Sequence, residues 1–121
     1  MGERVLAVDD SASMRQMVAF TLREAGFDVA EAEDGVAALA LARNEAFRIV
    51  LCDVNMPNLD GIGLVKALRQ MPDYRFTPLL MLTTESSPEK KQEGKAAGAT
   101  GWLVKPFNPE QLITTMRRVL G

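Results

Sequence analysis

The stretch Ile49-Val-Leu-Cys-Asp-Val-Asn-Met-Pro-Asn-Leu-Asp-Gly61 decides the fold of this chain. Its apolar residues run without a polar break from Ile49 to Cys52 and stop at Asp53. A short apolar run that is followed by turn residues is typical of a strand buried on both faces of a sheet. Pro57 and the Asp60-Gly61 pair then turn the chain out of the strand. We therefore expect Asp53 at the carboxyl end of a central strand.

Strand-like and helix-like segments alternate on either side of this stretch and fill the chain. Strict alternation predicts a parallel sheet with helices on both faces, and right-handed crossovers make it a doubly wound α/β fold. The predicted strands are Arg4–Val8, Asp28–Ala32, Phe47–Asp53, Leu79–Leu82 and Trp102–Val104. The predicted helices begin at Ser11 or Ser13, at Asp34, at Leu59–Gly61, at Ser86–Pro88 and at Asn108 or Pro109.

The fourth predicted helix is the most polar. Its residues Glu89 to Ala97 are mostly hydrophilic, so we expect it to pack weakly and to face solvent. Two glycines lie in this part of the chain. We interpret Gly94 and Gly98 as helix-end residues, because glycine is common where helices end.

Composition excludes several classes of protein. The 121 residues are 47% hydrophobic with a net charge of −2, which suits one domain over residues 1–121 and argues against a nucleic-acid partner. No apolar run approaches the roughly 20 residues of a membrane span, and the N-terminus lacks a signal-peptide pattern. The single cysteine excludes an internal disulfide. We therefore expect a cytoplasmic protein with no output domain and no membrane partner.

The sequence contains no histidine. Serine–histidine triads, histidine bases and most transition-metal sites are therefore excluded. The chain cannot carry phosphate on histidine either. Any phosphoryl group has to come from another molecule and be accepted by a different type of residue.

Polar side chains stand at the ends of four of the five predicted strands. Asp9 and Asp10 follow the first strand, Asp53 ends the third, Thr83 follows the fourth and Lys105 follows the fifth. Parallel strands have their carboxyl ends at one edge of the sheet, where open α/β sheets bind ligands. Each residue alone has an ordinary explanation, such as a helix cap for Asp9 or a solvated charge for Lys105. Their joint placement at matched strand ends favours a functional site.

The chemistry of this set indicates phosphoryl transfer. Three carboxylates close together repel one another unless protons or a cation neutralise them, and Mg²⁺ prefers such hard oxygen ligands. Asp53 is the candidate phosphate acceptor, because a carboxylate nucleophile can form an acyl phosphate. Lys105 can pair with Asp53 at rest and with a phosphoryl oxygen afterwards. Thr83 can donate a hydrogen bond to another phosphoryl oxygen.

Together these motifs resemble the receiver domain of response regulators. The resemblance covers essentially the whole chain and rests on Asp9-Asp10, the Asp53 strand with Met56-Pro57 and Asp60-Gly61, Thr83 and Lys105-Pro106-Phe107. It implies a flavodoxin-like fold with five helices around a five-stranded parallel sheet of order 2-1-3-4-5. It also implies that Asp53 is the phosphorylated residue, and that Mg²⁺ is held by Asp10, Asp53 and the Asn55 carbonyl, with Asp9 assisting through water.

The resemblance assigns further roles around the site. Thr83 and Lys105 would hold the phosphoryl group, and the Lys105–Pro106 bond would be cis. Trp102 lies where receivers keep a switch aromatic, usually Tyr or Phe. Phosphorylation would pull Thr83 inward and let Trp102 rotate, so that the fourth helix, last strand and last helix present a different face to a partner.

Two positions bear on how the phosphoryl group is lost. Asn55 and Glu85 resemble the residues that CheY-type proteins carry beside the route of a hydrolytic water, and they would set the phosphoryl lifetime. Asn55 also stands where haloacid-dehalogenase-type phosphatases have the second acid of Asp-x-Asp. We therefore expect that the protein is not an enzyme. It would catalyse only its own phosphorylation and dephosphorylation.

Asp9-Asp-Ser-Ala-Ser-Met-Arg15 and Ala97-Gly-Ala-Thr-Gly-Trp-Leu-Val-Lys-Pro-Phe107 resemble stand-alone chemotaxis regulators of CheY type. This implies a monomer that a histidine kinase phosphorylates and that controls flagellar rotation by binding the motor switch. A phosphorelay shuttle or a phosphate sink with the same Asp53 chemistry is an alternative. An inert flavodoxin-like binding module is an alternative of another class, and it predicts no Mg²⁺-dependent phosphorylation.

Overall fold

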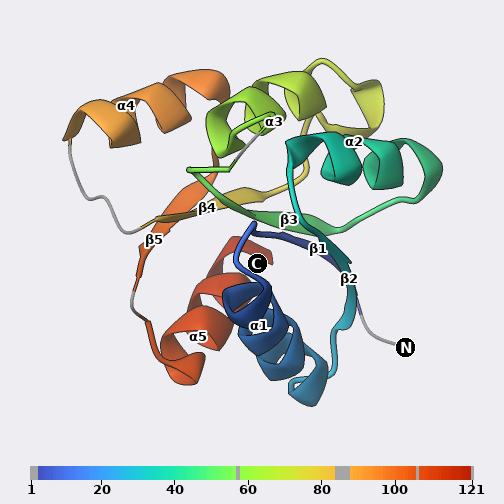
Figure 1. The fold of residues 1–121 in the computed structure, drawn as a ribbon, viewed down its shortest axis with the longest axis vertical. Coiled ribbons are helices and arrows are strands. Elements are labelled where there is room, and N and C mark those ends of the chain that lie inside the picture. The colour runs from blue at the N-terminus through green and yellow to red at the C-terminus, as the bar shows by residue number, and fades with distance from the viewer. Residues whose placement is uncertain (1–2, 57, 84–87, 106, 121) are drawn as a thin grey trace.

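The computed structural model describes residues 3–56, 58–83, 88–105 and 107–120. Strands and helices alternate along the described chain, as predicted (Figure 1). The strands are β1 (Arg4–Val8), β2 (Asp28–Ala32), β3 (Ile49–Asp53), β4 (Leu79–Thr83) and β5 (Gly101–Val104). The helices are α1 (Ala12–Glu24), α2 (Gly35–Asn44), α3 (Gly61–Arg69), α4 (Pro88–Ala97) and α5 (Pro109–Leu120), with a short 3₁₀ helix, η1 (Pro72–Tyr74).

The strands form one parallel sheet in the order β2-β1-β3-β4-β5, which confirms the predicted doubly wound fold. The pairing register sets the level at which the strands end. Val8 of β1 pairs with Cys52 of β3, so the residues that follow them, Asp9 and Asp53, lie at the same level of the carboxyl edge. The register of the sheet therefore assembles the site.

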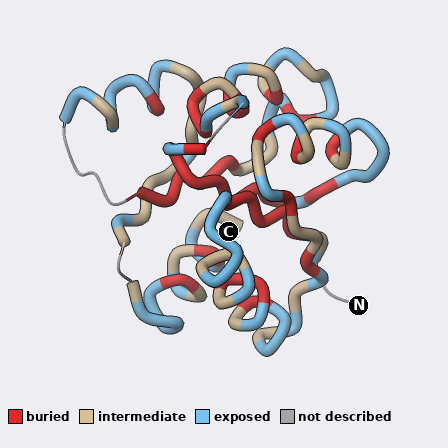
Figure 2. The backbone as a smooth tube through the Cα atoms, viewed as in Figure 1, coloured by how far each residue is buried: buried red, intermediate tan, exposed pale blue. Residues whose placement is uncertain are grey.

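Helices cover both faces of the sheet. Figure 1 shows α2, α3 and α4 on one face and α1 and α5 on the other. All residues of β3 and β4 are buried, and Figure 2 shows this buried centre between the two helical layers. Residues of alternate parity along the strands feed two hydrophobic clusters, for example Val50 on the α2–α3–α4 side and Leu51 on the α1–α5 side. None of the described helices combines the length and apolar character needed to cross a membrane.

Side-chain caps explain where three helices begin. Ser11, Asp34 and Asp60 accept hydrogen bonds from backbone N–H groups in the first turns of α1, α2 and α3. The candidate cap of α4, Ser86 or Ser87, lies outside the described residues. The predicted start of the third strand at Phe47 was wrong, because the strand begins at Ile49. Phe47 is buried ahead of the strand beneath the Arg4 guanidinium, so its apolar character reflects packing rather than strand pairing.

Helix α4 is the polar, weakly packed helix that the sequence predicts, and Gly94 is its one buried residue. Gly98 follows the helix with a φ of +114°, a backbone conformation that favours glycine. Gly94, however, lies inside α4, so its interpretation as a helix-end glycine was wrong. The reason is tertiary: a Cβ atom at Gly94 would lie 2.5 Å from Cζ3 of Trp102.

Candidate functional site

Asp53 is the last residue of β3, and its side chain is largely buried, with 8% of the residue exposed. The chain returns against it at the start of α3. The Gly61 N–H donates to the Val54 carbonyl at 2.9 Å, and a Cβ atom at Gly61 would collide with the carbonyl oxygen of Asp53. Glycine at position 61 therefore lets α3 begin directly against the backbone of the candidate acceptor.

Asp9 and Asp10 follow β1 and differ in their surroundings. Asp9 is buried, and its two carboxylate oxygens have separate partners: the Ser11 N–H donates to Oδ1 at 2.9 Å and the Lys105 ammonium donates to Oδ2 at 2.9 Å. Asp10 is exposed. The structure therefore fixes one carboxylate of the pair by hydrogen bonds and leaves the other at the surface of the site.

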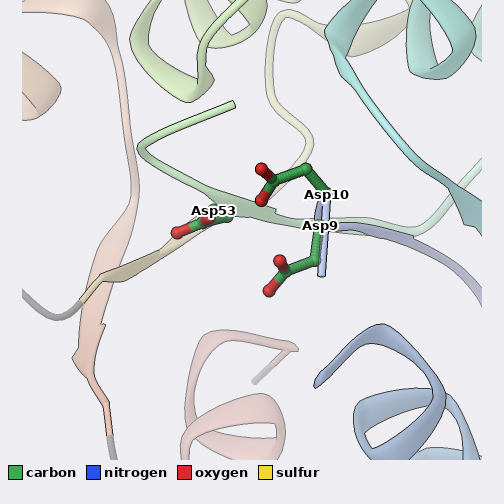
Figure 3. A group of neighbouring side chains, drawn as sticks. All are labelled: Asp9, Asp10 and Asp53. Carbon is green, nitrogen blue, oxygen red and sulfur yellow. The ribbon is translucent and has the colours of Figure 1, made fainter. Parts of the chain in front are cut away.

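The three carboxyl groups converge as predicted. One oxygen from each of Asp9, Asp10 and Asp53 lies within 4.8 Å of the other two, and Figure 3 shows the side chains directed to the same side. Hard carboxylate oxygens at this spacing suit Mg²⁺, which takes few carboxylates and keeps room for water and phosphate oxygens. The donor set therefore fits the predicted ion.

Lys105 joins the two sides of the site. Its backbone N–H donates to the Thr83 carbonyl at 2.6 Å, which holds the residue against the end of β4. Its Nζ lies 2.9 Å from Asp9 Oδ2 and 3.4 Å from Asp53 Oδ1. The sequence predicted a pair with Asp53 alone. The lysine instead bridges both acids and lies nearer to Asp9.

Burial and charge act against each other at Asp53. Burial raises the pKa of its carboxyl, the Lys105 ammonium opposes that rise, and the negative charges of Asp9 and Asp10 add to it. The neighbouring thiol of Cys52 is fully buried, and burial raises its pKa to about 12. The site therefore disfavours an isolated negative charge. A divalent cation would neutralise that charge, and a phosphoryl group would need the Lys105 ammonium as its partner.

The other predicted site residues lie around this core. Thr83 ends β4 and is buried. Trp102 pairs with Met81, two residues before Thr83, so Trp102 and Thr83 are on the same face of the sheet. Asn55 is exposed in the loop after β3. Glu85 and Pro106, with the predicted cis bond, lie outside the described residues.

Arg15 supports the site without having been predicted from the sequence. Its Nη1 donates to the Asp9 carbonyl oxygen at 2.7 Å, and its Nε donates to Glu31 at 3.3 Å. These contacts tie the end of β1 to α1 and β2. No sequence signal pairs a helical arginine with a backbone carbonyl in another element, so only the folded structure reveals this contact.

Comparison with known proteins places the whole chain beside one family. The model of the response regulator receiver domain matches residues 5–117. A CheY homolog from Campylobacter jejuni is 39% identical over 120 residues, covering 98% of this chain and 92% of the relative. The chemotaxis response regulator CheY4 of Vibrio cholerae has a similar structure, with a TM-score of 0.95 at 60% identity over 98% of this chain and 99% of its own.

A second similar structure contains a metal. It is the receiver domain of the sensor histidine kinase PA1611 from Pseudomonas aeruginosa, with a TM-score of 0.93 and 26% identity over 100% of this chain and 99% of its own. A magnesium ion is coordinated in its active site cleft.

Proposed function

Because this chain belongs to the response regulator receiver domain family, we propose that Asp53 accepts a phosphoryl group from the phosphohistidine of a histidine kinase. An oxygen of the Asp53 carboxylate forms a bond to phosphorus as the bond from phosphorus to the kinase histidine nitrogen breaks. The nitrogen keeps the electron pair, and the product on Asp53 is an acyl phosphate. The protein catalyses only this step and the later hydrolysis, and Asn55 and Glu85 set the rate of that hydrolysis.

We propose Mg²⁺ as the cofactor, held by Asp10, Asp53 and the backbone carbonyl of Asn55, with Asp9 contributing through water. The carboxylate cluster and the magnesium of the similar PA1611 receiver support this assignment. When bound, the ion neutralises charge on the transferring phosphoryl group. The chain's own residues position the acceptor. The backbone at Gly61 packs directly against the backbone of Asp53, and the Ser11 N–H orients the carboxylate of Asp9.

Lys105 exchanges partners during the reaction in this proposal. Its ammonium lies between Asp9 and Asp53 before transfer and can pair with a phosphoryl oxygen on Asp53 afterwards. The hydroxyl of Thr83 donates to a second phosphoryl oxygen. The observation that carries the proposal is this one ammonium lying within 4.0 Å of two of the three clustered carboxylates.

The test is intact-mass detection of one phosphoryl group after incubation with a small phosphodonor, with and without Mg²⁺. We expect Mg²⁺-dependent addition to the native protein and none to Asp53→Asn. Asp60→Asn is the matched control, because Asp60 caps α3 in the same loop and asparagine caps equally well. Absence of the added mass in the native protein with Mg²⁺ would support the inert binding module instead.

For the output we propose a cytoplasmic, monomeric chemotaxis regulator that binds the flagellar motor switch through α4, β5 and α5. Its similarity to the Campylobacter and Vibrio chemotaxis proteins supports this role. Phosphorylation draws Thr83 inward and lets Trp102 rotate. We expect the beryllofluoride complex to bind the motor switch protein more tightly than the unmodified protein does. Transfer of phosphate to a histidine phosphotransfer protein without such binding would indicate a shuttle.

A further inference from the structure

The indole of Trp102 packs beneath α4 against Gly94, and we call this packed position of the indole its seat. Trp102 lies on the edge strand β5, is partly buried, and packs against the hydrophobic cluster on the α2–α3–α4 face. Its outer ring lies against Gly94: a Cβ atom there would be 2.5 Å from Cζ3 and 3.4 Å from Cε3 and Cη2. No hydrogen-bonding side chain takes part in this contact, so it depends on shape alone.

Within the described part of the chain, one polar group of the packed indole has no hydrogen-bond partner. The Trp102 Nε1 is buried, and among the described residues no acceptor lies within hydrogen-bond distance of it. A buried donor without an acceptor disfavours the conformation that buries it. Within the described residues, the seated indole therefore gains packing against Gly94 and lacks a hydrogen bond at its nitrogen.

Helix α4 has few other attachments to the sheet. Gly94 is its one buried residue, and at its C-terminal end the Arg69 guanidinium donates to the Gly98 carbonyl at 2.7 Å. The middle of α4 thus meets β5 mainly where the indole lies against Gly94. A change in the indole position therefore alters the contact between β5 and the middle of α4.

We propose that the missing side chain at Gly94 positions Trp102 and thereby sets how strongly the protein resists its phosphorylated conformation. Any side chain at position 94 removes the space for the outer ring and displaces the indole. The link from Trp102 to Asp53 rests on the proposed function, through Thr83 on the same face of the sheet. By linkage, a change that destabilises the seated state favours every ligand that selects the unseated one.

The experiment compares native protein with Gly94→Ala by two readouts. The first is the emission maximum and acrylamide quenching of Trp102, the single tryptophan, without phosphodonor. The second is the beryllofluoride concentration for half saturation in Mg²⁺, measured by calorimetry. We expect stronger quenching in Gly94→Ala and a half-saturation concentration about fivefold lower, in the usual range of coupling between sites. Gln92→Ala is the matched control, because Gln92 is exposed on the same helix.

The outcomes separate the two proposals. Unchanged emission and quenching in Gly94→Ala would contradict the proposal that the missing side chain at Gly94 positions Trp102. Changed emission with unchanged beryllofluoride affinity would overturn the link to Asp53. If the native protein does not bind beryllofluoride in Mg²⁺, the proposed function fails, and the quenching comparison still decides the seat.

A double-mutant cycle guards against loss of folding. Trp102→Phe removes the outer ring of the indole, so Gly94→Ala should destabilise the native background and not the Trp102→Phe background in urea unfolding. Alanine is the better helix former, so helix propensity alone predicts stabilisation in both backgrounds. An equal cost in both backgrounds would show that Trp102 is not the residue that requires glycine.

Discussion

At Asp53, opposing effects act on a single carboxyl. Burial, with Asp9 and Asp10 nearby, raises its pKa, whereas the ammonium of Lys105 holds the pKa down. An acid whose pKa is higher in the folded than in the unfolded state keeps its proton in the fold while the unfolded chain has lost it. Between the ordinary value of 3.8 and the folded pKa, the folded state therefore binds more protons, and stability falls as pH rises.

The metal-free protein should consequently be less stable than its Asp53→Asn variant at neutral pH. The variant lacks this titration, so its free energy of unfolding should fall less as pH rises above about 4. Urea unfolding in chelator at several pH values measures the difference, and Mg²⁺ should remove the variant's advantage. Asp73→Asn, at an exposed aspartate of η1, is the control. Equal pH profiles of native protein and Asp53→Asn would contradict a raised pKa of Asp53 in the folded state.

At the scale of residues, the location of a side chain could be predicted from the sequence where it follows from the position of the residue on a strand. Asp9, Asp53 and Lys105 were placed together because strand ends of a parallel sheet share an edge. Arg15 and Gly94 were not predicted in their observed settings, because their contacts lie in other elements and depend on side-chain packing. The catalytic roles of the clustered residues remain predictions.

At the scale of elements, Tyr74 holds the end of α2 by contacts between residues that are far apart in the sequence. Its side chain is buried, and its hydroxyl lies 2.9 Å from the Ala42 carbonyl oxygen and 2.7 Å from that of Glu45. The last carbonyls of a helix lack partners within the helix itself. The single hydroxyl proton of Tyr74 is therefore shared between two carbonyl oxygens at and just after the end of α2, far away in the sequence.

Tyr74→Phe should lower the free energy of unfolding by about 1–3 kcal/mol, the cost of leaving buried acceptors without a donor. Urea unfolding provides the measurement. Thr77→Val is a suitable control, because the Thr77 hydroxyl makes a solvent-exposed bond of 3.4 Å to the Asp73 carbonyl oxygen and should matter little. Similar costs for both variants would mean that burial of the Tyr74 hydroxyl is unimportant.

Helix beginnings were predictable because the capping residues lie next to the helix in the sequence. The side-chain hydrogen bonds that join different elements were not predictable. Arg69 of α3 shows the difference. Its guanidinium donates to carbonyl oxygens of Tyr74, Thr77 and Gly98, so it joins α3, the loop before β4 and the end of α4. An isolated arginine in a helix gives no sequence signal of this kind.

At the scale of the molecule, alternation of strands and helices was enough to predict a parallel sheet with two helical layers. The strand order was a different matter, because alternation allows several orders and β2-β1-β3-β4-β5 came from the resemblance to receivers. The observed order places β1 and β3 side by side at the centre. This adjacency, rather than the parallel arrangement alone, brings the acids that follow β1 to the acid at the end of β3.

The bridge from Lys105 to Asp9 spans almost the whole chain, and this has a consequence during synthesis. A ribosome releases Asp9, Asp10 and Asp53 before Lys105 has been made, and β4 pairs only with β3 until β5 joins its other edge. A nascent or truncated chain therefore has the three acids without their cation. Under the proposed function, only finished copies accept phosphate, and unfinished ones do not drain the kinase.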